Sequence, residues 1–252
     1  REAADDADRV HRGNRLTGGH PRPVALGATR GASLGEIGDR GIIAMGAPSM
    51  STRPRPRLTP EEYLAIERGA EQKSEYVNGE MFALSGASFA HTVITMNVAA
   101  GLHARLRGKP CTVHSADLKV RVEATGLHAY PDVVVICGEP RFVDAEGDVV
   151  ANPVLLVEVL SDSTEKWDRG AKFGHYRRLA SLVEILFVSQ REARIEQYVR
   201  QPDDRWLLSE VLGVEGVVSL PSLGCDLPLS EVYAKAALEA GDGGNVPLGS
   251  AG

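Results

Sequence analysis

Apolar residues recur at helical spacing in three parts of the chain. Thr59-Pro60-Glu61-Glu62 combines an N-cap threonine, a proline in the first turn and a glutamate that completes a capping box, which predicts a short helix ending near Arg68. Ser88 is a suitable N-cap and Gly108 a suitable C-terminal stop, so we expect a long helix between them. Residues 167–179 are expected to form a third helix. The apolar positions of the long helix are Val93, Ile94, Met96, Val98, Leu102 and Leu106.

Alternating side chains and continuous apolar runs indicate strands. Residues 73–77 and 80–84 flank Asn78-Gly79, which is the strongest short signal for a β-hairpin. Residues 117–122 alternate apolar with charged side chains, so Lys119 and its charged neighbours are expected to face solvent. Further strands are predicted over residues 182–188, 193–199, 206–212 and 217–220, with a short helix after them.

Two runs stand apart because they are apolar throughout. Residues 130–137 and 154–160 have the pattern of central strands that are covered on both faces. Each nevertheless contains one acid, Asp132 in the first and Glu158 in the second. Burying an unpaired carboxylate costs several kcal/mol or more. A divalent cation would remove that cost, and so would capping of turns or pairing with arginine.

The segment after Glu158 adds a cation to this pair of acids. Asp168, Lys172 and Tyr176 are spaced i, i+4 and i+8, so they share one helical face. Within the acidic residues 57–252 the same segment is the most basic one, which suits a substrate that carries phosphate. A solvated helix with an Asp168–Lys172 pair is the alternative interpretation. The basic residues of this segment are Lys166, Arg169, Lys172, Arg177 and Arg178.

Composition divides the chain into three parts. Residues 1–56 are rich in Gly, Arg and Pro and have no apolar period, so we predict a disordered leader. Residues 57–235 are predicted to form the folded domain, and residues 236–252 a flexible tail. The longest apolar run, residues 133–137, is far shorter than a membrane span, so no membrane association is expected.

Charge is unevenly distributed along the chain. The formal charge is −6, with +3 on residues 1–56 (nine Arg, six Asp and Glu) and therefore −9 on the remainder. An acidic domain does not attract nucleic acid through its net field, so nucleic-acid binding would require a local basic patch. The three cysteines, Cys111, Cys137 and Cys225, are widely separated and lack a CxxC pair. We therefore expect buried thiols, no disulfide framework and a cytoplasmic protein.

Taken together, these motifs resemble the PD-(D/E)XK nuclease superfamily and, more closely, the Uma-two family of restriction endonucleases. The resemblance covers roughly residues 57–234. It implies an α/β (α+β) fold with a restriction-endonuclease-like core, in which helices flank a mixed central β-sheet. The residues that carry it are Leu58-Thr59-Pro60-Glu61-Glu62-Tyr63, Tyr76-Val77-Asn78-Gly79-Glu80, Ala90-His91, Tyr130-Pro131-Asp132-Val133-Val134, Val157-Glu158-Val159-Leu160-Ser161, Asp168, Lys172, Tyr176 and Tyr233.

The resemblance implies specific roles for some of these residues. Asp132 and Glu158 would hold a catalytic Mg²⁺ or Mn²⁺, and Glu75 matches an upstream acid that supplies a further ligand, directly or through water. Leu160 departs from the superfamily pattern, which has lysine two residues after the glutamate. In the Uma-like group the basic role moves to the following helix, here onto Lys172.

Four residues are candidates for supporting roles. Asp168 and Tyr176 share the face of Lys172, and Tyr176 would position the nucleophile. His91 matches the family pattern and would contact a phosphate or the outer shell of the metal, although a lone histidine on an apolar helix also suits a structural role. Asp117 would approach the site from a neighbouring strand or serve a turn.

The expected function is therefore a divalent-metal-dependent endonuclease that hydrolyses phosphodiester bonds in DNA. A homodimer is the candidate assembly. Three alternatives are open: an inactive nuclease fold that serves as a binding or adaptor module, a metal-dependent phosphoesterase for small substrates, and a self-associating structural protein. The module is favoured by Leu160 and by the acidic charge.

Overall fold

The computed structural model describes residues 57–238, so the predicted leader (1–56) and most of the predicted tail (236–252) lie outside the described residues. No helix in the described range has the length and apolar character that a membrane span requires. In chain order the elements are α1 (Pro60–Arg68), β1 (Ser74–Val77), β2 (Glu80–Ala83), α2 (Phe89–Arg105), β3 (Cys111–Ser115), β4 (Lys119–Val122), β5 (Leu127–Ala129), β6 (Val133–Cys137), β7 (Val149–Val150), β8 (Leu155–Leu160), α3 (Glu165–Trp167), the π-helical segment η1 (Asp168–Lys172), α4 (Phe173–Tyr176), β9 (Glu184–Ser189), β10 (Arg194–Arg200), β11 (Trp206–Leu212), β12 (Val217–Leu220), β13 (Cys225–Pro228) and α5 (Leu229–Val232).

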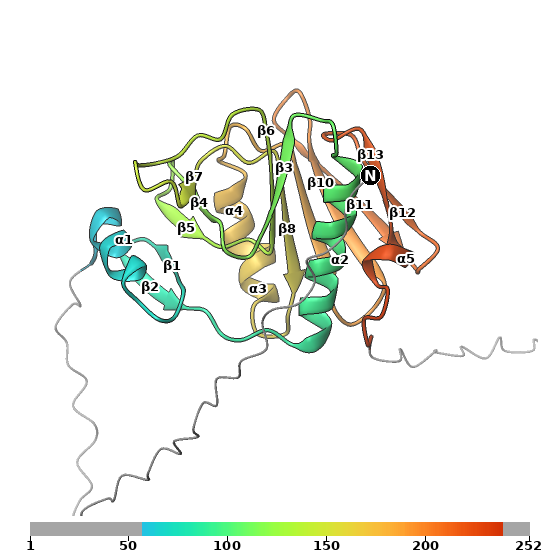
Figure 1. Cartoon of the computed structure of the whole chain (residues 1–252), viewed down its shortest axis with the longest axis horizontal. Coiled ribbons are helices and arrows are strands. Elements are labelled where there is room, and N and C mark those ends of the chain that lie inside the picture. The colour runs from blue at the N-terminus through green and yellow to red at the C-terminus, as the bar shows by residue number, and fades with distance from the viewer. Residues whose placement is uncertain (1–56, 239–252) are drawn as a thin grey trace, which may run out of the picture. The chain divides into compact units, whose positions relative to one another are not determined.

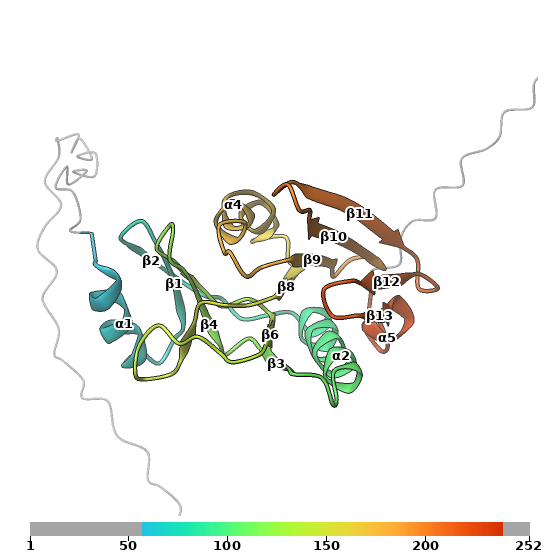
Figure 2. The same cartoon turned by 90° about the horizontal axis from the view of Figure 1, so that it is seen from above.

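The largest sheet has six strands in the order β11-β10-β9-β8-β6-β3. Strands β8 and β9 are parallel and the other neighbours are antiparallel, so the sheet is mixed as predicted. The segment α3–η1–α4 connects the two parallel strands. Figures 1 and 2 show α2 on one face of this sheet and α4 on the other. The two apolar runs, β6 and β8, are neighbours in its centre.

Alternate residues of the central strands face two different cores because side chains in a strand point to opposite faces. In β8, Leu155, Val157 and Val159 pack in the cluster that contains α2 and α5. Leu156 and Leu160 instead pack with Tyr176 and Leu179, on the α4 side. Glu158 has the parity of Leu156 and Leu160, so the period of the strand directs it toward the segment that carries Lys172.

A second sheet of five strands, in the order β2-β1-β5-β4-β7, carries the N-terminal part of the domain. Its β1–β2 hairpin turns at Asn78 and Gly79, whose φ angles of 52° and 88° are those of the predicted tight turn. Helix α1 begins with the predicted capping box, in which Thr59 and Glu62 exchange hydrogen bonds. Both local predictions are therefore confirmed.

Some predicted elements differ from the structure. The helix expected over residues 167–179 consists of α3, η1 and α4 in succession, with a π-helical turn in the middle. Met96, expected on the apolar face of α2, is 63% exposed. Two residues along a helix rotate a side chain by about 200°, so Met96 points away from the face that buries Ile94 and Val98. Strands β3, β5, β7 and β13 were not predicted, since they are short or lack clear alternation.

The expectation of free thiols is wrong for two of the three cysteines. Cys111 on β3 and Cys137 on β6 are directly opposite each other across an antiparallel pair and form a disulfide. Only Cys225 of the three is a free thiol. Separation along the chain, 26 residues here, says nothing about distance once two strands pair. Because disulfides are typical of oxidising compartments, this bond does not support the expected cytoplasmic location.

Candidate active site

Glu158 is the buried centre of the candidate site. It lies in the middle of β8 and is only 4% exposed. Tyr176, at the end of α4, donates a hydrogen bond of 2.7 Å to Oε1 of Glu158. Burial and the charge of Glu158 raise the pKa of the Tyr176 hydroxyl well above its usual value, so this group stays a hydrogen-bond donor.

The Lys172 ammonium lies among three carboxylates. Its Nζ is 2.9 Å from Oε1 of Glu75, 3.0 Å from Oε1 of Glu158 and 3.4 Å from Oδ1 of Asp168. These acids come from β1, β8 and η1, so three separate elements converge on one cation. Lys172 and the three acids are each 5% exposed or less.

The low-dielectric surroundings perturb all of these groups. Burial raises the pKa of Glu158 well above its usual value, and Lys172 opposes that shift. Burial raises the pKa of Asp168 in the same way. For Lys172 itself burial disfavours the ammonium, yet the charge of Glu158 and the other neighbouring acids outweighs burial and raises its pKa well above normal. Buried groups with strongly shifted pKa values and a specific charge partner are typical of functional sites.

Asp132 lies directly before β6 and next to Glu158. The last residue pair between the two strands is Val133 with Val157, and the backbone N–H of Val159 donates a 2.7 Å hydrogen bond to Oδ2 of Asp132. His91, in the first turn of α2, places Nε2 3.3 Å from the same oxygen. Burial lowers the pKa of His91, but the hydrogen bond and charge of Asp132, together with the charge of Asp168, raise it overall.

The other predicted residues are placed as follows. Glu75 also accepts a 3.3 Å hydrogen bond from the backbone N–H of Tyr130, which fixes it beside Lys172. Asp117 lies on the surface, with its side chain 84% exposed and paired with Lys73, so it is not brought to the site. Leu160, at the position of the superfamily lysine, is buried in the core. Of the eight predicted residues, five (Glu75, His91, Asp168, Lys172 and Tyr176) lie around Glu158 and Asp132, and Asp117 does not.

The donor set can be compared with the needs of a metal ion. Glu158 and Asp132 are each held through a single oxygen, Oε1 of Glu158 and Oδ2 of Asp132, and no hydrogen bond or ion pair within residues 57–238 uses the other oxygen. Within the same range, no group of three or more His, Cys, Asp or Glu side chains is arranged to hold a metal. Two carboxylates with free oxygens suit Mg²⁺, which takes one or two carboxylates and completes its shell with water and phosphate oxygens.

A second buried ion pair lies on the other sheet and was not predicted from the sequence. Lys119, expected on a solvent-exposed face, is 1% exposed and forms an ion pair with Glu67 of α1. Tyr130 donates a hydrogen bond to the other oxygen of Glu67, and the Lys119 ammonium lies 5.3 Å from the centre of the Tyr130 ring. Alternation along one strand could not reveal this burial, because α1 covers that face of the second sheet.

The fold and the site together define a class of protein. A mixed sheet with one acid in a central strand, a second acid directly before the neighbouring strand and a lysine against the first acid is the architecture of restriction-endonuclease-like nucleases. A crystal structure of a protein described as a putative nuclease belonging to DUF820, from Anabaena variabilis, has the same fold, with a TM-score of 0.58. The match covers 70% of this chain and 97% of that chain at 15% sequence identity.

The sequence comparisons identify the family. The family model of Uma2, described as "Putative restriction endonuclease", matches residues 60–230, and the chain belongs to this family. Two proteins of Synechocystis sp. are similar to it. The uncharacterized protein sll1609 is 37% identical over 62% of this chain and 88% of its own length. The uncharacterized protein slr1290 is 34% identical over 71% of this chain and 93% of its own length.

Proposed function

We propose that this protein is a divalent-metal-dependent endonuclease that hydrolyses phosphodiester bonds in DNA. The observation that carries the proposal is the contact between Lys172 and Glu158, with Asp132 directly before the adjoining strand β6. The lysine that the superfamily places two residues after the glutamate is replaced here by a lysine from another element. What the role requires is positive charge beside the acid, and the contact supplies it.

The residues divide the work as follows. Asp132 and Glu158 would hold Mg²⁺ or Mn²⁺, and such an ion would supply a lowered pKa of its bound water and positive charge beside the phosphoryl oxygens. Lys172 orients the attacking water or stabilises the charge that develops on the phosphate. Tyr176 holds Glu158 in place through its 2.7 Å hydrogen bond. Glu75 and Asp168 hold the Lys172 ammonium in position.

The proposal is tested by plasmid cleavage with Mg²⁺ or Mn²⁺. Asp132→Asn, Glu158→Gln and Lys172→Met should each reduce the rate about 100-fold or more, since each removes a group that acts on the developing charge. Asp117→Asn is the matched control, because Asp117 is exposed and away from the site, and it should cleave at the wild-type rate. Circular dichroism verifies that each variant is folded. Wild-type rates in the three site variants would reject these assignments.

A second candidate is an inactive nuclease fold that binds nucleic acid or protein. It is favoured because Lys172 already compensates the buried acids, so the fold does not need a metal for its stability. Titration calorimetry with Mn²⁺ separates the two functions. An endonuclease binds Mn²⁺ in a manner that Glu158→Gln abolishes, whereas an inert module has no such site. Release of phosphate from small phosphate esters, without plasmid cleavage, would instead indicate a phosphoesterase.

A further inference from the structure

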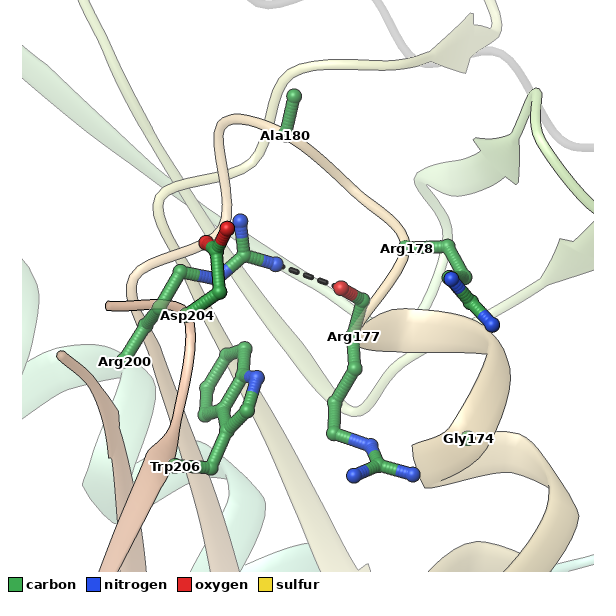
Figure 3. A pocket seen from close by; sticks show the side chains of 7 residues that line it. All are labelled: Gly174, Arg177, Arg178, Ala180, Arg200, Asp204 and Trp206. Carbon is green, nitrogen blue, oxygen red and sulfur yellow. Dashed lines mark hydrogen bonds between the residues drawn. The ribbon is translucent and has the colours of Figure 1, made fainter. Parts of the chain in front are cut away.

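A basic pocket lies at the C-terminal end of α4, beside the turn between β10 and β11. Its volume is about 480 Å³, and it is lined by Gly174, Arg177, Arg178, Ala180, Arg200, Asp204 and Trp206. Figure 3 shows the three arginine side chains spread around the pocket without converging on one point. Separated cations of this kind match successive charges on an extended anion better than a single small ion.

The three arginines of the pocket differ from most other arginines of the domain in their lack of a carboxylate partner within residues 57–238. Seven arginines elsewhere in residues 57–238 form ion pairs with carboxylates. In that range, Arg177, Arg178 and Arg200 form no ion pair with an acid within 4.0 Å. Asp204 also lines the pocket and reduces its positive potential. Positive charge is thus concentrated locally on a domain whose residues 57–252 carry −9.

Two of the guanidinium groups are held in place by the fold. Arg200 donates hydrogen bonds of 2.6 and 2.9 Å to the carbonyl oxygens of Arg177 and Leu179, and it lies 5.0 Å from the Trp206 ring. Its Nε is buried and has no partner within the described residues. Arg177 lies over the ring of Phe173 at 4.9 Å. Fixed guanidinium groups lose little conformational entropy when they bind phosphate.

We propose that this pocket binds the phosphodiester backbone of the nucleic-acid strand at a distance from the bond that is cut. The identity of the strand as substrate rests on the proposed nuclease function. The geometry links the two places, since one segment carries Lys172 and Tyr176 inward to Glu158 and presents Arg177 and Arg178 outward. A strand bound here is therefore positioned relative to the catalytic acids.

The test measures binding without cleavage. Anisotropy of labelled DNA, as duplex and as single strand, is followed with the full chain in EDTA over a series of KCl concentrations. Arg177→Gln combined with Arg178→Gln should weaken binding about 10-fold or more and reduce the slope of log K against log salt by about two. Asp204→Asn should strengthen binding about twofold, because it removes a repulsive charge.

The matched control is Arg141→Gln, which removes an exposed arginine that is paired with Glu123 away from the pocket. It should alter affinity by less than about twofold. The proposal is overturned if the double variant binds DNA like the wild type or like Arg141→Gln, or if inorganic phosphate binds the pocket and DNA does not. Arginine-dependent binding without plasmid cleavage would overturn the nuclease function alone. Cleavage that does not depend on these arginines would overturn the pocket alone.

Discussion

Single residues in this domain show how buried charge is compensated by other protein groups. Lys172 is paired with three acids and Lys119 with Glu67, and both lysines are almost completely buried. A buried pair gives little net stability compared with an apolar pair, but removal of one partner leaves the other charge uncompensated. The consequence is that these lysines cannot be removed without effect on the folded state.

We expect Lys172→Met to lower the free energy of unfolding by about 3–5 kcal/mol, since it leaves the acids around Glu158 without their counter-ion. Urea denaturation followed by circular dichroism measures the change. Arg141→Gln breaks an exposed pair and should cost at most about 1 kcal/mol. Equal losses in the two variants would show that Lys172 is not a buried counter-ion.

A pH-dependent effect is expected from His128, which is fully buried beside Tyr63 and Tyr76. Burial lowers its pKa from 6.5 to about 4. Between these pH values the unfolded chain binds more protons than the folded chain, so stability falls as the pH is lowered through this window. The loss should approach about 3 kcal/mol.

Urea denaturation at pH 7 and pH 4.5 checks this expectation. His128→Gln should lose less stability than the wild type over this range, because it lacks the titrating group. His103→Gln, at an exposed position of α2, is the control and should follow the wild type. If His128→Gln is as sensitive to acid as the wild type, the acid sensitivity has another origin.

At the scale of elements, the segment between β8 and β9 shows a local prediction that was correct in its contacts and incomplete in its geometry. The helical spacing placed Asp168, Lys172 and Tyr176 on one face. In the structure Lys172 and Tyr176 contact Glu158, and Asp168 contacts Lys172. The π-helical turn within this segment was not anticipated. Such turns are frequent at functional sites, and no side-chain period in the sequence identifies them.

The edge strand β3 is joined to β6 by the disulfide between Cys111 and Cys137. Reduction, or Cys137→Ser, should lower the free energy of unfolding by about 3 kcal/mol, because the bond restricts the unfolded chain over a loop of 26 residues. Urea denaturation with and without dithiothreitol measures this. Cys225→Ser should keep the full effect of dithiothreitol, and wild-type protein that does not respond to it would contradict the bond.

On the scale of the whole molecule, the domain places its functional charge in two regions. Lys172 and its acids lie where β1 of the second sheet, β8 of the first sheet and η1 meet. The pocket at the end of α4 holds three arginines that form no ion pair within residues 57–238. The net charge of the domain therefore says little about what it binds. The homodimer and the cytoplasmic location stay predictions.

A metal that binds only the folded state should stabilise the whole domain. At a Mn²⁺ concentration about 100 times the dissociation constant, the gain is about 2.7 kcal/mol, visible as a higher melting temperature. We expect the rise for the wild type and for Asp117→Asn, and its loss in Asp132→Asn and Glu158→Gln. An equal rise in all four proteins would place the bound metal elsewhere.

The sequence by itself determined the capping box, the Asn78-Gly79 hairpin, the central apolar strands and the family, because each depends on residues that are near one another in the chain or on a set of short motifs. The tertiary structure alone decided that Lys172 meets Glu75, that Lys119 is buried against Glu67, that two cysteines are bonded and that three arginines share a pocket. These contacts depend on the order of strands in the sheets and on which helix covers which face. A local period of 2 or 3.6 residues carries no information about either.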